Sequence, residues 1–142
     1  SSPANSDLHH VRASDVKVNA DRGHLYFDET EGDTSPGHTY SADSDSWEPP
    51  REVKGDIARA LFYMAVRYEG NEPDETDLEL ADTPDFSKRC HGKLSVLLEW
   101  DRLDPVSLEE KARNEKIFRN YQGNRNPFID HPEFVQRVFA RP

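Results

Sequence analysis

The chain has 142 residues, a length that favours one domain built around a single core. Acidic residues outnumber basic ones by 28 to 18, which gives a net charge of −10 at pH 7. Mean hydropathy is −0.95, and no apolar run approaches the roughly 18 residues of a membrane-spanning helix. The composition argues against a membrane segment, and against a protein that binds nucleic acid through a globally positive surface.

The acidic residues are spread unevenly. Most of the unmatched acid lies in residues 28–85, whereas from Lys88 to Arg141 the two signs are close to balanced. Arg outnumbers Lys two to one, and Arg is the better bidentate ligand for phosphate. Two interpretations follow: a local basic groove on an acidic body, or an acidic surface that only serves solubility. The single cysteine, Cys90, excludes an internal disulfide and a thiolate metal cluster.

The first fifty residues are rich in Gly, Pro, Ser, Asp and Thr, a composition typical of loops. A short helix is predicted over 15–21, with Ser14 as its N-cap and Gly23 after its end. Leu25-Tyr26-Phe27 is the best candidate for a strand, and residues 28–46 are predicted to form a long loop.

Apolar residues at helical spacing predict a central helix over 53–68. The stripe consists of Val53, Ile57, Leu61, Met64, Ala65 and Tyr68, widened by Phe62 and Tyr63. A second helix is predicted over 93–103, with Leu94, Leu97, Leu98 and Trp100 as its buried side. Asp104-Pro105 then stops it.

Two capping patterns predict the C-terminal helices. Ser107 and Glu110 form a capping box for a helix over 108–122, which Gly123 ends. Asp130 and Glu133 predict the start of a short terminal helix in the same way. Because strand signals are weak, the expected fold class is mainly α with little β (α+β), in a single domain over 1–142.

Residues 7–24 combine the side chains of a hydrolytic site. Asp7-Leu8-His9-His10 precedes the short helix, Asn19 lies on it, and Asp21-Arg22-Gly23-His24 follows. Histidine acts as a general base near neutral pH, and amide and carboxylate oxygens suit a hard cation such as Mg²⁺. Arginine stabilises the charge of a phosphorane-like transition state. The alternative is that these residues only cap the helix or solvate the surface.

The stretch from Gln122 to Pro132 is polar, punctuated by glycine and proline, and lies between two predicted helices. In one interpretation Arg125 and His131 line the floor of a cleft. In the other, Asn124 and Asn126 satisfy turn backbone groups, and the stretch holds the helices in register under the site.

Several blocks, in the same order along the chain, resemble the endonuclease I family of secreted and periplasmic bacterial nucleases. They are the 7–10 block with Val18-Asn19 and Arg22-Gly23, Trp47-Glu48-Pro49-Pro50, the start of the central helix, Leu97-Leu98-Glu99-Trp100, and the 122–132 stretch. The resemblance implies a ββα-metal (His-Me finger) nuclease, with central amphipathic helices packed on a partial ββα-metal motif. It implies a metal-dependent endonuclease without strong sequence preference that cleaves DNA and/or RNA, is secreted or periplasmic, and uses Asn19 to bind Mg²⁺ (or Mn²⁺ or Ca²⁺).

Two departures from the family pattern bear on the general base. The family has a Glu-His pair on a strand well before this block, whereas only six residues precede Asp7. We therefore expect the domain to be incomplete at its N-terminus. The family also has Asn after Arg-Gly, where this chain has His24. Asp21-Arg22-Gly23-His24 is similar to a motif of another ββα-metal family. In that family the motif precedes the metal-binding Asn, whereas here it follows Asn19, so we interpret the likeness as coincidence.

The candidate site residues are therefore His10 as the catalytic residue that faces the site, Asn19 as the metal ligand, and Arg22, Arg59 and Arg125 as nucleic-acid contacts. For Arg59 the alternative is an ion pair with Asp56 one helical turn away. Three hypotheses for function stay open: a metal-dependent endonuclease whose base comes from a segment outside this chain, a non-catalytic nucleic-acid-binding or interaction module, and an acidic secreted domain with a protein partner.

Overall fold

The computed structural model describes residues 3–14, 16–23, 25–30, 40–43, 45–68, 80–82 and 92–140. The helices there are η1 (Pro3–Ser6), α1 (Val16–Arg22), η2 (Arg51–Val53), α2 (Lys54–Arg67), α3 (Leu94–Leu103), α4 (Leu108–Asn120), α5 (Pro127–Asp130) and α6 (Phe134–Val138). The strands are β1 (Tyr26–Phe27), β2 (Ser41–Ala42) and β3 (Ser46–Glu48). The predicted class, mainly α with little β, is confirmed. Cys90, Asp15, His24 and most of the loop predicted over 28–46 lie outside the described residues.

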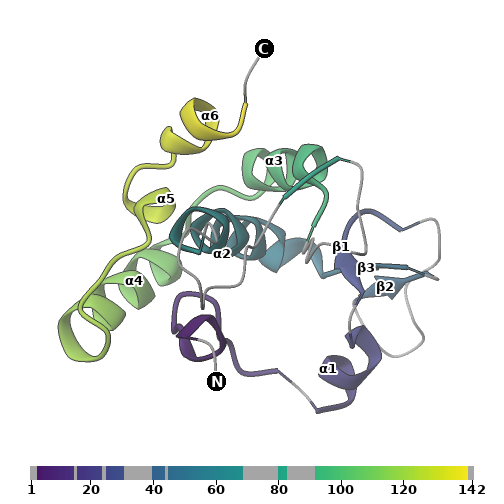
Figure 1. The fold of residues 1–142 in the computed structure, drawn as a ribbon, viewed down its shortest axis with the longest axis horizontal. Coiled ribbons are helices and arrows are strands. Elements are labelled where there is room, and N and C mark those ends of the chain that lie inside the picture. The colour runs from purple at the N-terminus through teal and green to yellow at the C-terminus, as the bar shows by residue number, and fades with distance from the viewer. Residues whose placement is uncertain are drawn as a thin grey trace.

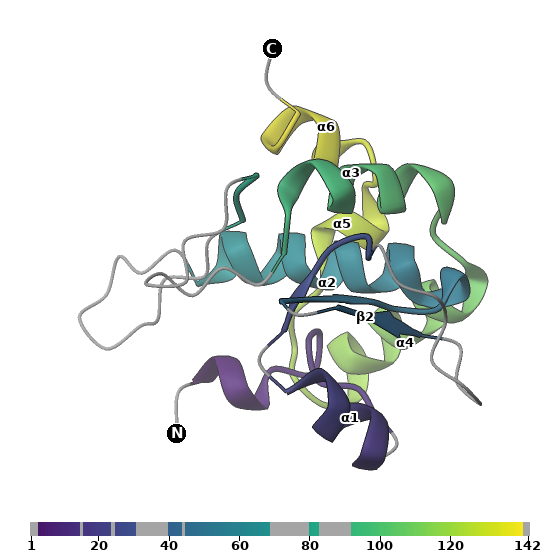
Figure 2. The same ribbon diagram turned by 90° about the vertical axis from the view of Figure 1, so that its right-hand side faces the viewer.

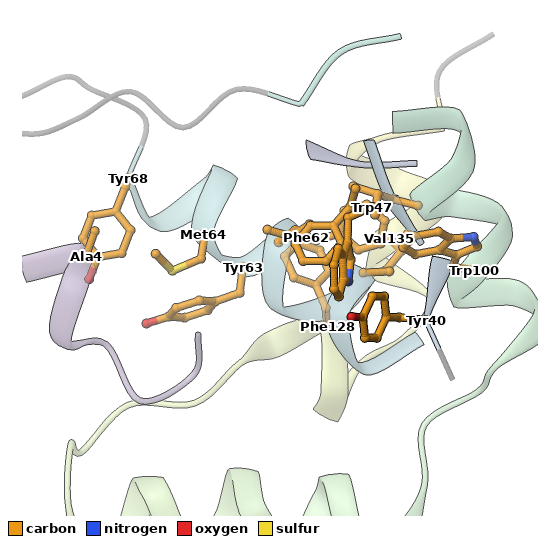
Figure 3. Close-up of a cluster of buried hydrophobic side chains, with 14 residues drawn as sticks. Ala4, Tyr40, Trp47, Phe62, Tyr63, Met64, Tyr68, Trp100, Phe128 and Val135 are labelled. Atoms are coloured by element: carbon orange, nitrogen blue, oxygen red, sulfur yellow. The ribbon is translucent and has the colours of Figure 1, made fainter. Parts of the chain in front are cut away.

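Helix α2 is the centre of the molecule, as its apolar stripe predicts. In both views α3 and α6 lie on one side of it, while η1 and α1 lie on the other (Figures 1 and 2). Ala58 and Phe62 are fully buried in α2, and Leu97 and Trp100 of α3 pack against that face. Figure 3 shows the aromatic character of this core, which also takes side chains from the sheet and from α5 and α6.

A small three-stranded sheet lies beside the start of α2, in the order β1-β3-β2 (Figure 1). Strand β1 is parallel to β3 and pairs Phe27 with Trp47, whereas β2 is antiparallel to β3. Tyr40 stacks on Trp47 with ring centroids 4.1 Å apart. The Leu25-Tyr26-Phe27 prediction is confirmed by β1. Sequence patterns did not predict β2 and β3, because each has only two or three residues and no room for an alternating pattern.

The helix ends follow local chemistry, with two errors in the predictions. Ser107 caps α4 by accepting a hydrogen bond from the Glu110 N–H at 3.1 Å, as predicted, but the Glu110 carboxylate, expected to complete the capping box, binds Arg59 instead. Gly23 and Gly123 follow their helices with positive φ values of 52° and 78°, which glycine adopts readily. The predicted capping role of Asp130 is wrong: Asp130 is the last residue of α5, and its carboxylate binds Arg125.

Among the described residues, no helix is long and apolar enough to cross a membrane.

A candidate active site between the N-terminal loop and helix α2

A cavity of about 590 Å³ lies among the N-terminal loop, α1, the sheet and the start of α2. His10, Asn19 and Arg22, three of the five predicted site residues, line it. Its other walls are formed by apolar side chains of the sheet and of α2, including Trp47 and Ile57. The structure thus brings together, from two segments of the chain, a titratable ring, an amide oxygen and a guanidinium.

Helix α1 carries two of these residues and lies at the edge of the core, where Val18 packs against it. None of its seven residues, all of which are described, is buried, and in both views it lies at the periphery of the molecule (Figures 1 and 2). Asn19 is exposed and lines the cavity. Its role as a metal ligand stays a prediction, and access to the cavity is a condition that this role requires.

The described residues match only part of a metal site. They contain no group of three His, Cys, Asp or Glu side chains arranged to hold a metal ion. Asp56 also lines the cavity, but its carboxylate pairs with Arg12 at 3.3 Å. Mg²⁺ keeps several waters and uses one or two carboxylates together with substrate phosphates. Asn19 fits as one ligand of such an ion, and further oxygens would have to come from the substrate and from outside the described residues.

Arg22 has the surroundings of an anion-binding arginine. Its guanidinium carbon lies 4.4 Å from the centre of the Phe27 ring, a cation–π arrangement that fixes the side chain against the sheet. Its Nε is buried and has no hydrogen-bond partner among the described residues. Burial lowers the pKa of Arg22, because desolvation disfavours the charge. A phosphate oxygen would satisfy the unpaired N–H and neutralise that charge.

The His10 ring is suited to accept a proton at neutral pH. His10 is an exposed residue, but the protein atoms around its ring desolvate it and lower its pKa below the usual 6.5; the positive charge of Arg22 lowers the pKa further, while Asp7 acts in the opposite direction. His10 is therefore mainly neutral at pH 7, the state in which its free ring nitrogen can act as a base.

The loop that carries His10 is fastened to α2 by a buried carboxylate. Asp7 accepts hydrogen bonds from the Tyr63 hydroxyl at 2.7 Å and the Tyr68 hydroxyl at 2.8 Å. Figure 3 shows both tyrosines extending from α2 toward the N-terminal segment. Burial alone would raise the pKa of Asp7, but the hydrogen bonds from Gln122, Tyr63 and Tyr68 outweigh burial and lower it. Asp7 is thus a charged anchor at neutral pH.

The 122–132 stretch holds the same loop from the other side. The Gln122 side chain accepts from the Leu8 N–H at 2.9 Å and donates to Asp7 at 3.0 Å. Nε2 of the buried His9 ring donates to the Asn124 carbonyl at 2.9 Å, since a carbonyl oxygen can only accept. These contacts support the structural interpretation of the stretch. His131 is exposed, stacks on Phe134, and is not among the described residues that line the cavity.

The prediction that Arg59 binds nucleic acid is wrong in this structure. Its side chain has no exposed surface, and Glu110 binds it through two hydrogen bonds of 2.8 Å each. Its Nη1 donates to Asp101 at 2.8 Å, and Asp56 lies 3.6 Å from Nη2. The alternative Asp56–Arg59 pair is therefore present, as part of a larger buried ionic cluster. Sequence could not show this, because Glu110 is 51 positions away.

Arg125 is about one-third exposed and lies outside the cavity lining given by the described residues. It pairs with Asp130 and Glu115, and these hydrogen bonds raise its pKa. A contact between Arg125 and nucleic acid stays a prediction.

Two cavity residues, Arg12 and Asp56, were not predicted as site residues. The only sequence signal for Arg12 is its place two residues after His10.

The family model described as Endonuclease I matches residues 1–133, and the chain belongs to this family.

The most similar relatives include two Bacillus proteins. The chain is 55% identical over 137 residues to an extracellular ribonuclease of Bacillus subtilis (strain 168), covering 94% of this chain and 46% of the relative. It has the same identity and coverage with the extracellular ribonuclease of Bacillus amyloliquefaciens. An extracellular deoxyribonuclease of Aeromonas hydrophila is 30% identical over 130 residues, which are 87% of this chain and 48% of the relative. The chain spans about half the length of the curated relatives that it matches.

Proposed function

We propose that the protein acts as a metal-dependent endonuclease without sequence specificity, hydrolysing the phosphodiester bonds of DNA and/or RNA outside the cytoplasm. The observation that carries the proposal is the shared cavity of His10, Asn19 and Arg22. Family membership supports it, as do relatives named extracellular ribonuclease and extracellular deoxyribonuclease. Lack of sequence specificity is expected, because these groups suit the phosphate, which is the same at every nucleotide.

Each residue has a distinct part in the proposed mechanism. Arg22 binds the non-bridging oxygens of the scissile phosphate and stabilises the charge that develops on them. Neutral His10 accepts the proton of the attacking water. Asn19 would hold Mg²⁺, or Mn²⁺ or Ca²⁺ in its place, and the ion when bound supplies further neutralisation of phosphate charge. The resemblance gives a second source for the base, a Glu-His pair in the part of the relatives that this chain does not span.

The alternative function is a nuclease-like module that binds nucleic acid or a protein without cleaving it. It is favoured by one observation: among the described residues, Asn19 is the one unpaired oxygen ligand that we can assign to a metal. The two proposals differ in what happens to a substrate, because a binding module retains it intact.

The test is digestion of supercoiled plasmid and of RNA with Mg²⁺ or Mn²⁺, with and without EDTA. We expect cleavage that EDTA abolishes and that Asn19→Ala reduces strongly. Asn120→Ala serves as the matched control, because Asn120 is exposed at the end of α4 and away from the cavity lining. Intact plasmid and RNA in both metals, for wild type and variants alike, would exclude cleavage by this chain and favour the alternative for it.

A further inference from the structure

The cavity has a second arginine, which the proposed chemistry leaves unused. Arg12 reaches the cavity from the N-terminal loop, whereas Arg22 reaches it from α1. The Arg12 side chain is 37% exposed, and its Nη1 lies 3.3 Å from Oδ2 of Asp56. Arg59, in contrast, makes two hydrogen bonds of 2.8 Å to Glu110, and its side chain has no exposed surface. The contact of Arg12 with Asp56 is longer, at 3.3 Å, and the Arg12 side chain is partly exposed to solvent.

Asp56 is a weak partner for Arg12. Its carboxylate also faces Nη2 of Arg59 at 3.6 Å, so its charge is shared between two guanidinium groups. Burial raises the pKa of Asp56, and the negative charge of Glu110 raises it further. If Arg12 leaves, Asp56 keeps Arg59 as a partner and can take up a proton. The cost of breaking the Arg12–Asp56 contact is therefore small.

Arg12 also lies close to a second positive charge. The Arg113 guanidinium donates to the Leu8 and Val11 carbonyls at 2.6 and 2.8 Å, which fixes it under the same loop. The pKa of Arg113 is lowered first by burial and then by the charge of Arg12. Arg113 thus adds a second positive charge near Arg12, and this favours the arrival of another anion beside Arg12.

We propose that Arg12 is a second phosphate-binding residue of the cavity, which exchanges Asp56 for the phosphate next to the one that Arg22 binds. The proposal rests on the proposed function and specifies its substrate class. The site holds two successive phosphates of a polynucleotide backbone, so it binds oligonucleotides much better than nucleoside monophosphates. Asp56 keeps Arg12 in place when the cavity holds no substrate.

The test measures binding of a short fluorescein-labelled single-stranded DNA by anisotropy, in EDTA so that cleavage does not interfere, over a series of salt concentrations. A single Arg12→Ala would also change the surroundings of the Asp56 carboxylate, which would keep only Arg59 as a partner, so the informative pair is D56N against the double variant R12A/D56N. We expect D56N to bind more tightly than wild type. The double variant should bind about tenfold more weakly than D56N, and its slope of log affinity against log salt should be shallower by about 0.7, the value for one phosphate contact on a single strand.

Arg102→Ala is the matched control for loss of one positive charge. Arg102 is exposed, pairs with Glu99 on α3, and is not among the described residues that line the cavity. Its loss should leave the salt slope unchanged. Displacement of the labelled DNA by adenosine 5′-monophosphate gives a second measurement: R22A should weaken the monophosphate, whereas R12A/D56N should not differ from D56N.

The outcomes separate this proposal from the proposed function. Equal salt slopes for D56N and R12A/D56N, with binding that still depends on Arg22, would overturn the role of Arg12 alone. Weaker binding by D56N than by wild type would overturn the exchange of Asp56 for phosphate. Wild-type protein that does not bind the labelled DNA at low salt would overturn both the proposed function and this inference. Thermal melting of each variant confirms that the compared proteins are folded.

Discussion

Arg59 and Arg22 are both arginines, but one is fully paired inside the protein and the other lies beside the cavity. Arg59 lies in the α2–α3–α4 region, where three carboxylates surround it and no side-chain surface is exposed. Arg22 lies on a helix that buries none of its residues, and its Nε has no partner among the described residues. An arginine whose donors are all paired within the protein stabilises the fold, whereas an arginine with an unpaired donor beside a cavity is available to a ligand.

The largest expected effect comes from breaking the buried cluster. Glu110→Ala leaves the Arg59 charge buried without its two-point partner, so the free energy of unfolding should fall by about 3–5 kcal/mol. Urea denaturation at pH 7 measures this. Glu109→Ala is the matched control, because Glu109 is exposed on the same turn of α4, and it should change stability by less than about 0.5 kcal/mol. Equal effects of the two substitutions would contradict the role given to the cluster.

The opposite result is expected for Arg22, whose loss should weaken binding and leave stability almost unchanged. Arg22→Ala should weaken oligonucleotide binding by about 10- to 100-fold, the effect of losing one charge-assisted contact of about 1.5–3 kcal/mol. Its unfolding transition should stay close to that of wild type, because α1 contributes no buried residue. Anisotropy and urea denaturation on the same preparation test both halves of the statement. An R22A protein that unfolds easily and binds normally would reverse the comparison.

Asp7 is expected to give an intermediate effect with a defined pH dependence. Because hydrogen bonds lower its folded pKa, the stability it contributes is present above the ordinary carboxyl pKa of about 3.9 and is lost as pH falls through the folded value. Asp7→Asn should therefore be less stable than wild type by about 1–3 kcal/mol at pH 7, with a difference that shrinks below about pH 4. Urea denaturation across pH 2–7 measures it. A difference that stays constant over this range would show that the charge of Asp7 is not what anchors the loop.

The smallest expected effect is at the start of α4. Ser107→Ala removes the side-chain acceptor of the Glu110 N–H and should lower stability by about 1 kcal/mol. Ser107→Asp retains an acceptor and should restore most of the loss. The rescue matters because Ser107 and Arg59 both act on Glu110, one on its backbone and one on its carboxylate. If Ser107→Ala were as damaging as Glu110→Ala, the cap would be positioning the whole cluster.

The sequence predicted what depends on local pattern. The stripe of α2, the Ser107 cap and the glycine ends of α1 and α4 follow from spacing and from backbone chemistry within a few residues. The blocks that resemble the family predicted Asn19 and Arg22 as site residues, and both line the cavity. What could not be predicted depends on pairs far apart in the chain. Arg59 with Glu110 and Asp7 with Tyr63 are invisible to periodicity, because either partner alone has the appearance of a surface or cleft residue.

The most direct test of the central claim is whether a divalent cation meets the Asn19 side chain in this cavity. Mn²⁺ broadens NMR signals of nearby nuclei, so substoichiometric Mn²⁺ added with a short single-stranded DNA reports its location. We expect selective broadening of the Asn19 side-chain amide and of the His10 ring, lost in Asn19→Ala and reversed by EDTA. Broadening confined to exposed acidic residues such as Asp45, with Asn19 and His10 unaffected, would contradict the account.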